Sequence, residues 1–218
     1  QLAYVEAAEV AFAAGFDAVD IKSCHGYLIN EIFACFGRKG KYGGLFENRT
    51  RILLDIMDKI RDRVGDDKII TTRFPMYDAI PYPYGWGVDK DDYTKPDFAE
   101  PKKLIKLLEQ RGVKIMNTTI GNPYYNPHIG RPFNEPILGV YEEPEHPLIG
   151  LNRILTITGK IQKAFPNIAM VGTGYSWLRS MLPYVGAASK KNGRVTIVGA
   201  GRMSFAYPDF PHDIVKKG

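Results

Sequence analysis

Three polar side chains follow one short apolar segment, at a spacing that suits oxygen binding and proton transfer. The segment Ala18–Ile21 leads into Lys22, His25 and Tyr27. A lysine ammonium can bind an anionic oxygen, an imidazole can donate to a carbonyl, and a tyrosine hydroxyl can deliver a proton. A single histidine after a strand is more often structural than catalytic, but three polar groups at one strand end favour a functional site. The adjacent Cys24 is expected to be a small packed residue rather than a nucleophile.

Two glycine-rich turns in the second half of the chain have the composition of a phosphate site. The first contains Gly172, Thr173 and Gly174, and the second contains Gly201 and Arg202. Glycine lets backbone N–H groups approach an anion, and a helix N-terminus adds partial positive charge. The alternative is that these glycines only make tight turns. Two such turns after consecutive strands favour phosphate, because the last two units of a barrel form the usual phosphate site.

Further candidate residues follow two other apolar segments. Arg73 lies at the C-terminal end of a β-branched segment, where a buried guanidinium needs a planar or anionic partner. Tyr124 and His128 lie in a later loop and are candidate substrate contacts, with loop packing as the alternative. We predict no metal site.

The elements that must position these residues alternate between strands and helices. Short apolar runs without polar alternation are typical of strands buried on both faces. They predict strands over Ala18–Ile21, Ile69–Phe74, Ile115–Asn117, Ala169–Gly172 and Val195–Val198. Apolar stripes at helical spacing predict helices over Ala7–Gly15, Arg51–Val64, Leu104–Gly112, Leu151–Phe165, Ser176–Val185 and Asp209–Lys216. Asn48 is expected to cap the second of these helices, and Glu47 to suit its positive end.

Loop lengths favour one architecture for this α/β chain. Helix-to-strand links are short, whereas residues 23–47, 75–100 and 121–149 form long loops after strands. Long loops at one end are typical of a TIM (β/α)8 barrel with its active site at the strand C-termini. We expect residues 1–218 to be a partial barrel domain that supplies the last five βα units, with the N-terminal strands outside it. A doubly wound parallel sheet is the alternative.

Composition restricts the functional classes. The 218 residues are 44% hydrophobic and 24% charged, which excludes disordered and low-complexity classes. No apolar run is long enough to span a bilayer, and no signal peptide is evident, so no membrane partner is expected. The net charge of +5 is scattered, which disfavours nucleic acid and suits a small anionic ligand. Two cysteines, Cys24 and Cys35, favour a reducing, cytoplasmic location.

Taken in order, these motifs resemble the old yellow enzyme family, in particular its branch of NADH:flavin oxidoreductases and 2,4-dienoyl-CoA reductases. The resemblance extends over nearly the whole chain. It includes Gly15–Ile21, His25–Leu28, Tyr42–Gly44, Glu47–Arg49, Arg73, Gly172–Gly174, Gly201–Arg202 and Pro208–Pro211.

The resemblance implies an FMN-dependent TIM barrel that moves hydride from NADH or NADPH to an activated C=C bond of an enoate, enone or enoyl-CoA. The two glycine turns and Arg202 would surround the FMN phosphate, and Arg73 would contact the N1–C2 carbonyl edge of the flavin. The dienoyl-CoA branch also has a 4Fe-4S cluster and a second nucleotide-binding portion, which would lie outside this chain. A homo-oligomer is a further expectation.

One position departs from the family pattern. The family usually has two histidines, or a histidine and an asparagine, three positions apart; the matching residues here are Lys22 and His25. A lysine there favours an acidic substrate or a different flavin contact. Tyr27 matches the proton-donating tyrosine of the dienoyl-CoA branch. Two alternatives stay open: an amine dehydrogenase of the trimethylamine dehydrogenase type, which Lys22 disfavours, and a non-redox barrel that binds a sugar phosphate.

Overall fold

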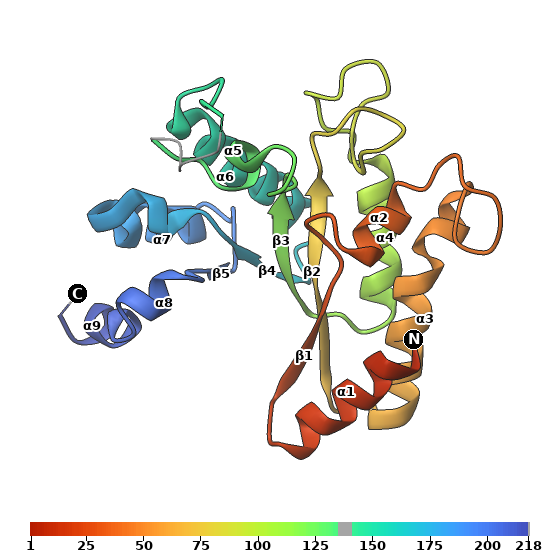
Figure 1. The fold of residues 1–218 in the computed structure, drawn as a ribbon. Helices are drawn as coiled ribbons and strands as arrows, with labels where there is room; N and C mark the ends of the chain where they lie inside the picture. Colours follow the sequence, from red (N-terminus) through yellow and green to blue (C-terminus); the bar gives the residue numbers. More distant parts are fainter. Residues whose placement is uncertain (135–140, 218) are drawn as a thin grey trace.

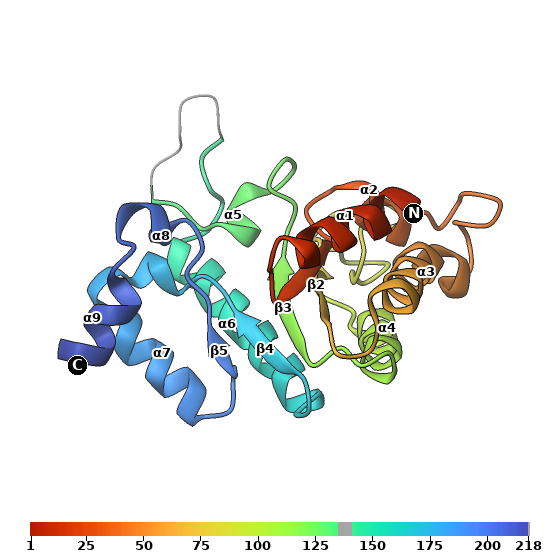
Figure 2. The ribbon, with the colours of Figure 1, turned by 90° about the horizontal axis from the view of Figure 1, so that it is seen from below.

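Five parallel strands form one curved sheet (Figures 1 and 2). The computed structural model describes residues 1–134 and 141–217, so part of the predicted loop 121–149 lies outside the described residues. The strands are β1 (Ala18–Lys22), β2 (Ile69–Tyr77), β3 (Ile115–Ile120), β4 (Ala169–Gly172) and β5 (Ile197–Val198). Every predicted strand is present, although the last pairs over two residues only.

The strand order identifies the fold as part of a (β/α)8 barrel. The described strands follow the order β1-β2-β3-β4-β5, and each pairs in parallel with its neighbour in sequence. A doubly wound sheet reverses direction at a switch point, whereas a barrel wall adds strands in one direction. The doubly wound alternative is therefore wrong.

Helices lie between the strands and around the outside of the sheet. They are α1 (Leu2–Ala13), α2 (Leu28–Phe33), α3 (Phe46–Val64), α4 (Ala99–Gln110), α5 (Pro127–Gly130), α6 (Pro147–Ala164), the 3-10 helix η1 (Tyr175–Met181), α7 (Leu182–Lys191), α8 (Met203–Ala206) and α9 (Phe210–Lys217). In the part of the chain that the structure describes, no helix is long and apolar enough to cross a membrane.

Several helix predictions need correction. The helices α1, α3, α4 and α6 all begin before the predicted starts at Ala7, Arg51, Leu104 and Leu151. The helix predicted over Ser176–Val185 is two elements, because η1 ends at Met181 and α7 begins at Leu182, where Pro183 suits the first turn of a new helix. Asn48 is not the N-cap of α3, since that helix begins at Phe46. Its side chain instead donates to the Gly43 carbonyl at 3.2 Å and accepts from Arg51 at 3.0 Å, which fastens the preceding loop to the helix.

The hydrophobic core lies between the outer face of the sheet and the helices. Ile21, Phe74, Met116 and Met170 point outward from four neighbouring strands and are buried in one cluster with residues of α3, α4 and α6. The opposite face of each strand is more open and forms the barrel interior. Alternate residues along each strand therefore face different sides: one set packs against the helices, and the other lines the barrel interior.

Arg49 fixes the loop that follows β1. Its guanidinium is buried, donates to the carbonyls of Phe33 and Gly44, and forms an ion pair with Glu100 of α4 at 2.6 Å. It also lies 3.9 Å from the ring centroid of Phe36. A buried guanidinium is stable only when its donors are satisfied, so this residue holds α2, α3 and α4 in one arrangement.

Candidate active site

One row of residues crosses the inner face of the sheet near its C-terminal end. Register places Lys22, Arg73, Asn117, Val171 and Ile197 side by side on β1 to β5. Side chains in register on parallel strands point to the same face. The sequence thus folds so that two cations and one amide lie next to one another in the barrel interior.

Arg73 is held by its backbone while part of its guanidinium has no partner. Its N–H donates to Asp20 Oδ1 at 2.8 Å. Burial raises the pKa of Asp20, and the Arg73 hydrogen bond and charge oppose that rise. Within the described residues, Arg73 Nε and Asn117 Oδ1 are buried and have no hydrogen-bond partner. Such groups are rare in folded proteins, so this corner of the interior is suited to a polar ligand.

His25 is presented by a left-handed turn. Its φ is +65°, an uncommon value for a residue other than glycine, and Gly26 follows with φ +69°. The ring Nε2 lies 2.9 Å from Thr119 Oγ1, at the end of β3. Burial, followed by the charges of Arg73, Lys22 and Arg202, lowers the pKa of His25 to about 4. The imidazole is therefore neutral at physiological pH and offers one N–H donor.

Lys22, Tyr27 and Tyr124 form one exposed cluster beside His25. The Lys22 ammonium lies 3.2 Å from the ring centroid of Tyr27, and the hydroxyls of Tyr27 and Tyr124 are 2.8 Å apart. The hydrogen bond between Tyr27 and Tyr124, followed by the charge of Lys22, lowers the pKa of Tyr27. A phenol with a lowered pKa is a better proton donor, so this arrangement suits proton delivery.

The two glycine turns meet at neighbouring strands. The N–H of Gly199 donates to the carbonyl of Gly172 at 2.7 Å, directly after the paired residues of β4 and β5. A Cβ at Gly199 would lie 2.8 Å from that carbonyl oxygen, and Gly174 has φ +94°. A Cβ at Gly201 would meet no protein atom within 4 Å. The backbone geometry therefore requires glycine at positions 199 and 174, whereas Gly201 borders open space.

Arg202 follows this second turn and acts on the same site. Its charge contributes to the lowered pKa of His25, as do those of Lys22 and Arg73. Three cationic side chains from β1, β2 and the turn after β5 thus affect one imidazole. The mouth of the barrel consequently has a positive potential that favours an anionic ligand.

His128 lies apart from this cluster. Its Nδ1 is 2.5 Å from the hydroxyl of Tyr141, and the two rings contact edge to face. Of the two residues predicted as substrate contacts in this loop, only Tyr124 contacts another member of the cluster. The proposed role of His128 stays a prediction.

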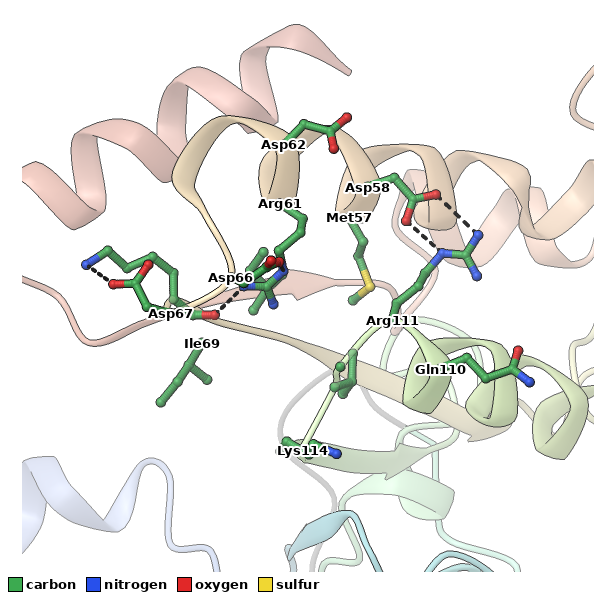
Figure 3. A pocket seen from close by; sticks show the side chains of 14 residues that line it. Met57, Asp58, Arg61, Asp62, Asp66, Asp67, Ile69, Gln110, Arg111 and Lys114 are labelled. Atoms are coloured by element: carbon green, nitrogen blue, oxygen red, sulfur yellow. Dashed lines mark hydrogen bonds and ion pairs between the residues drawn. The ribbon is translucent and has the colours of Figure 1, made fainter.

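A separate hollow of about 670 Å³ lies at the opposite ends of β2 and β3 (Figure 3). Its charged residues largely satisfy one another: Arg111 binds Asp58 through two hydrogen bonds, at 2.8 and 3.2 Å, and Arg61 donates to the carbonyls of Gly65 and Lys68. The N-terminal end of a barrel serves stability, whereas ligands bind at the other end. We therefore place the candidate site at the mouth. The described residues contain no group of three His, Cys, Asp or Glu side chains suited to a metal ion.

Two polar residues at the mouth were not predicted from sequence. Thr119 contacts His25, and Asn117 lies beside Arg73 in register. Both belong to β3 (Ile115–Ile120), whose polar residues Asn117, Thr118 and Thr119 are consecutive. The predicted strand ends at Asn117. A strand continued to Ile120 places Asn117 and Thr119, two residues apart, on the same face as Arg73.

Comparisons with known proteins show what the chain is similar to. Residues 1–179 match the model of the NADH:flavin oxidoreductase / NADH oxidase family. Enoate reductase 1 of Kluyveromyces lactis is 26% identical over 98% of this chain and 48% of that protein.

Solved structures extend the comparison to the fold. A 2-naphthoyl-CoA reductase in complex with 2-naphthoyl-CoA matches with a TM-score of 0.70 and 22% identity, over 99% of this chain and 28% of that one. Histamine dehydrogenase from Rhizobium sp. 4-9 matches with a TM-score of 0.67 and 21% identity, over 98% and 27%. The chain thus spans half or less of the length of each of these three proteins.

Proposed function

The chain belongs to the NADH:flavin oxidoreductase / NADH oxidase family, that of the old yellow enzymes, and from this we propose that it forms part of an FMN-dependent reductase of activated C=C bonds. NADH or NADPH is the reductant, and an enoate, enone or enoyl-CoA is the acceptor. Residues 1–218 contribute five units of the barrel. The observation that supports this most directly is the meeting of the glycine turns, Arg73 and His25 at one barrel mouth.

The residues at the mouth fit FMN. The buried Arg73 Nε needs an acceptor, and a flavin carbonyl edge is a planar acceptor that a guanidinium can reach from a neighbouring strand. The open space at Gly201 and the adjacent Arg202 suit a dianionic phosphate. We assign the phosphate to the turns containing Gly172, Thr173, Gly174 and Gly201, together with Arg202.

The chemistry divides between cofactor and chain. Bound FMN supplies hydride transfer. Arg73 stabilises negative charge on the flavin edge, and His25 donates its N–H to the oxygen of the substrate's activating carbonyl. Tyr27 protonates the carbon next to the one that receives hydride. Lys22 holds Tyr27 through its ring and attracts an acidic substrate to the mouth.

Proton delivery can be tested with two tyrosine variants. Tyr27→Phe removes the donor, so we expect reoxidation of the reduced flavin by alkene to slow by about 10²–10⁴-fold. Tyr124→Phe removes only the 2.8 Å hydrogen bond, so we expect a smaller loss, about fivefold, because one hydrogen bond is worth about 1 kcal/mol. Stopped-flow measurement of both half-reactions checks this: flavin reduction by NAD(P)H should be unchanged in both variants. Equal losses in the two variants would show that Tyr27 is not the donor.

Amine oxidation is the second candidate, because histamine dehydrogenase and a 6-hydroxypseudooxynicotine amine oxidase are among the matching structures. A cationic amine is best bound by a free aromatic face. Here the Lys22 ammonium already lies against Tyr27. The local charge therefore favours an acidic acceptor over a cationic donor.

One experiment separates these functions. The complete barrel protein is purified and its visible spectrum recorded; a flavin spectrum is expected. Its FMN is then reduced anaerobically with NADH or NADPH, and reoxidation is followed with an enoate, an enone, an enoyl-CoA and methylated amines as a panel. We expect alkenes alone to react. A protein that cannot be loaded with FMN would contradict both flavin functions, and turnover of amines alone would contradict alkene reduction.

A further inference from the structure

A buried carboxylate lies behind the turn that presents His25. Asp78 directly follows β2, and its side chain is buried. Its Oδ2 accepts from Asn30 Nδ2 and from the backbone N–H of Trp86, both at 3.0 Å. Its Oδ1 is buried and has no hydrogen-bond partner among the described residues.

Asn30 connects this carboxylate to the turn. Its side chain is buried, and while Nδ2 donates to Asp78, Oδ1 accepts from the N–H of Gly26 at 2.7 Å. Because one amide group makes both contacts, its orientation is set by Asp78: only with Nδ2 toward the carboxylate does Oδ1 face Gly26. The Gly26 N–H can only donate, and the ionised carboxylate of Asp78 can only accept, so the reversed amide would lose both hydrogen bonds.

The turn needs this support. His25 and Gly26 both have positive φ, and such a conformation at a residue other than glycine costs roughly 1 kcal/mol or more. Gly26 also packs closely on the loop after β3, where an added Cβ would lie 2.5 Å from Asn122 Nδ2. The turn is thus restrained from both sides, and His25 is directed toward Thr119.

The same carboxylate residue is fixed by the third loop. Asn126 Nδ2 donates to the backbone carbonyls of Asp78 and Ala79, at 3.0 and 2.6 Å. Its Oδ1 accepts from the N–H of Asn122 at 2.8 Å. The loops after β1, β2 and β3 therefore meet in one buried polar network.

From this geometry we infer that Asp78 is a positioning residue of the site: through Asn30 it holds the His25–Gly26 turn and so fixes the imidazole at the barrel mouth. Burial, with a smaller contribution from Glu31, raises the pKa of Asp78 to about 7, which reflects the cost of keeping this carboxyl without water. The carboxylate whose burial carries that cost is hydrogen-bonded to Asn30 and to the backbone of Trp86, which supports a role in holding the turn. The inference rests on the proposed function for its kinetic consequence, but the position of His25 can be measured without turnover.

The test uses the complete barrel protein loaded with FMN and three variants. Asn30→Ala removes the link, Asp78→Ala removes the anchor, and Asp78→Asn keeps one oxygen able to accept. Asn192→Ala, at the exposed end of α7, is the matched control. The ring 13C–1H signal of His25, assigned with His25→Ala, is recorded together with FMN content and the thermal midpoint.

We expect the His25 signal to move in Asn30→Ala and Asp78→Ala, to move less in Asp78→Asn, and to stay unchanged in the control. Turnover of alkene should fall by about 10–100-fold in the first two variants with FMN content retained, since a displacement of about 1 Å has effects of that size. Combining either with His25→Ala should add no further loss. If Asp78→Ala does not fold, Asn30→Ala gives the same test.

Two results would overturn the inference. One is an unchanged His25 signal in the Asn30→Ala protein. The other is a double variant with His25→Ala whose loss of alkene turnover equals the product of the two single losses. Absence of any alkene turnover in the parent protein is a different outcome. It would refute the proposed reductase function, while the His25 signal would still decide whether Asp78 acts on the turn.

Discussion

Replacing Arg73 with alanine in the complete barrel protein is expected to weaken FMN binding by about 10–150-fold. Hydrogen bonds to a charged group contribute roughly 1.5–3 kcal/mol, which corresponds to that range. Arg73 is well placed for such a bond, because its backbone is fixed by β1 and β3 on either side while its Nε has no partner among the described residues. Fluorescence titration of the apoprotein with FMN measures the effect.

The same substitution should lower the reduction potential of any flavin that still binds. Reduced flavin carries negative charge that a nearby cation stabilises, and loss of about 1.4 kcal/mol of that stabilisation corresponds to about 30 mV for two electrons. Arg111→Ala is the matched control, since that arginine is bound to Asp58 at the far end of the strands. Unchanged affinity and potential in Arg73→Ala would remove Arg73 from the flavin site.

The fold could be predicted because its signals are local. Each buried strand is a short apolar run, and each strand pairs with the next along the chain, so no long-range choice had to be made. Predictions failed where two signals compete. Asn48 is a good capping residue, but the turn that precedes it already continues into helix from Phe46, and the side chain binds Gly43 instead.

The candidate site could be predicted in part for the same reason. Lys22, His25 and Tyr27 follow one strand, so their proximity needs only that strand to be recognised. Thr119 and Asp78 come from β3 and from the loop after β2, and their contacts depend on register and on which carboxylate is buried. Neither the contact of Thr119 with His25 nor the burial of Asp78 can be predicted from composition or residue spacing.

The protonation state of His25 determines how its role can be tested by pH. Its pKa of about 4 lies below the 6.5 of an ordinary histidine, so the folded state favours the neutral ring. His25 therefore adds to the free energy of unfolding above pH 6.5, and this contribution is lost as the pH falls from 6.5 toward 4. Between pH 5 and 8, the titration of His25 should therefore cause no change in the rate of alkene reduction. A histidine-dependent limb near pH 6.5 would contradict this.

Replacing His25 with alanine should slow reoxidation of the reduced flavin by alkene about 10²–10³-fold, the usual cost of removing one donor to a developing oxyanion. Flavin reduction by NAD(P)H and FMN content should not change, because the imidazole contacts Thr119 and the mouth rather than the glycine turns. His25→Asn retains an N–H donor and should recover part of the rate, whereas His212→Ala, exposed on α9, should have no effect. Stopped-flow traces of the two half-reactions measure each step separately. Loss of FMN from the His25→Ala protein, with alkene reactivity of the remaining holoenzyme intact, would instead make His25 a flavin-binding residue, and the donor to the substrate would then have to be sought at Lys22 or Tyr124.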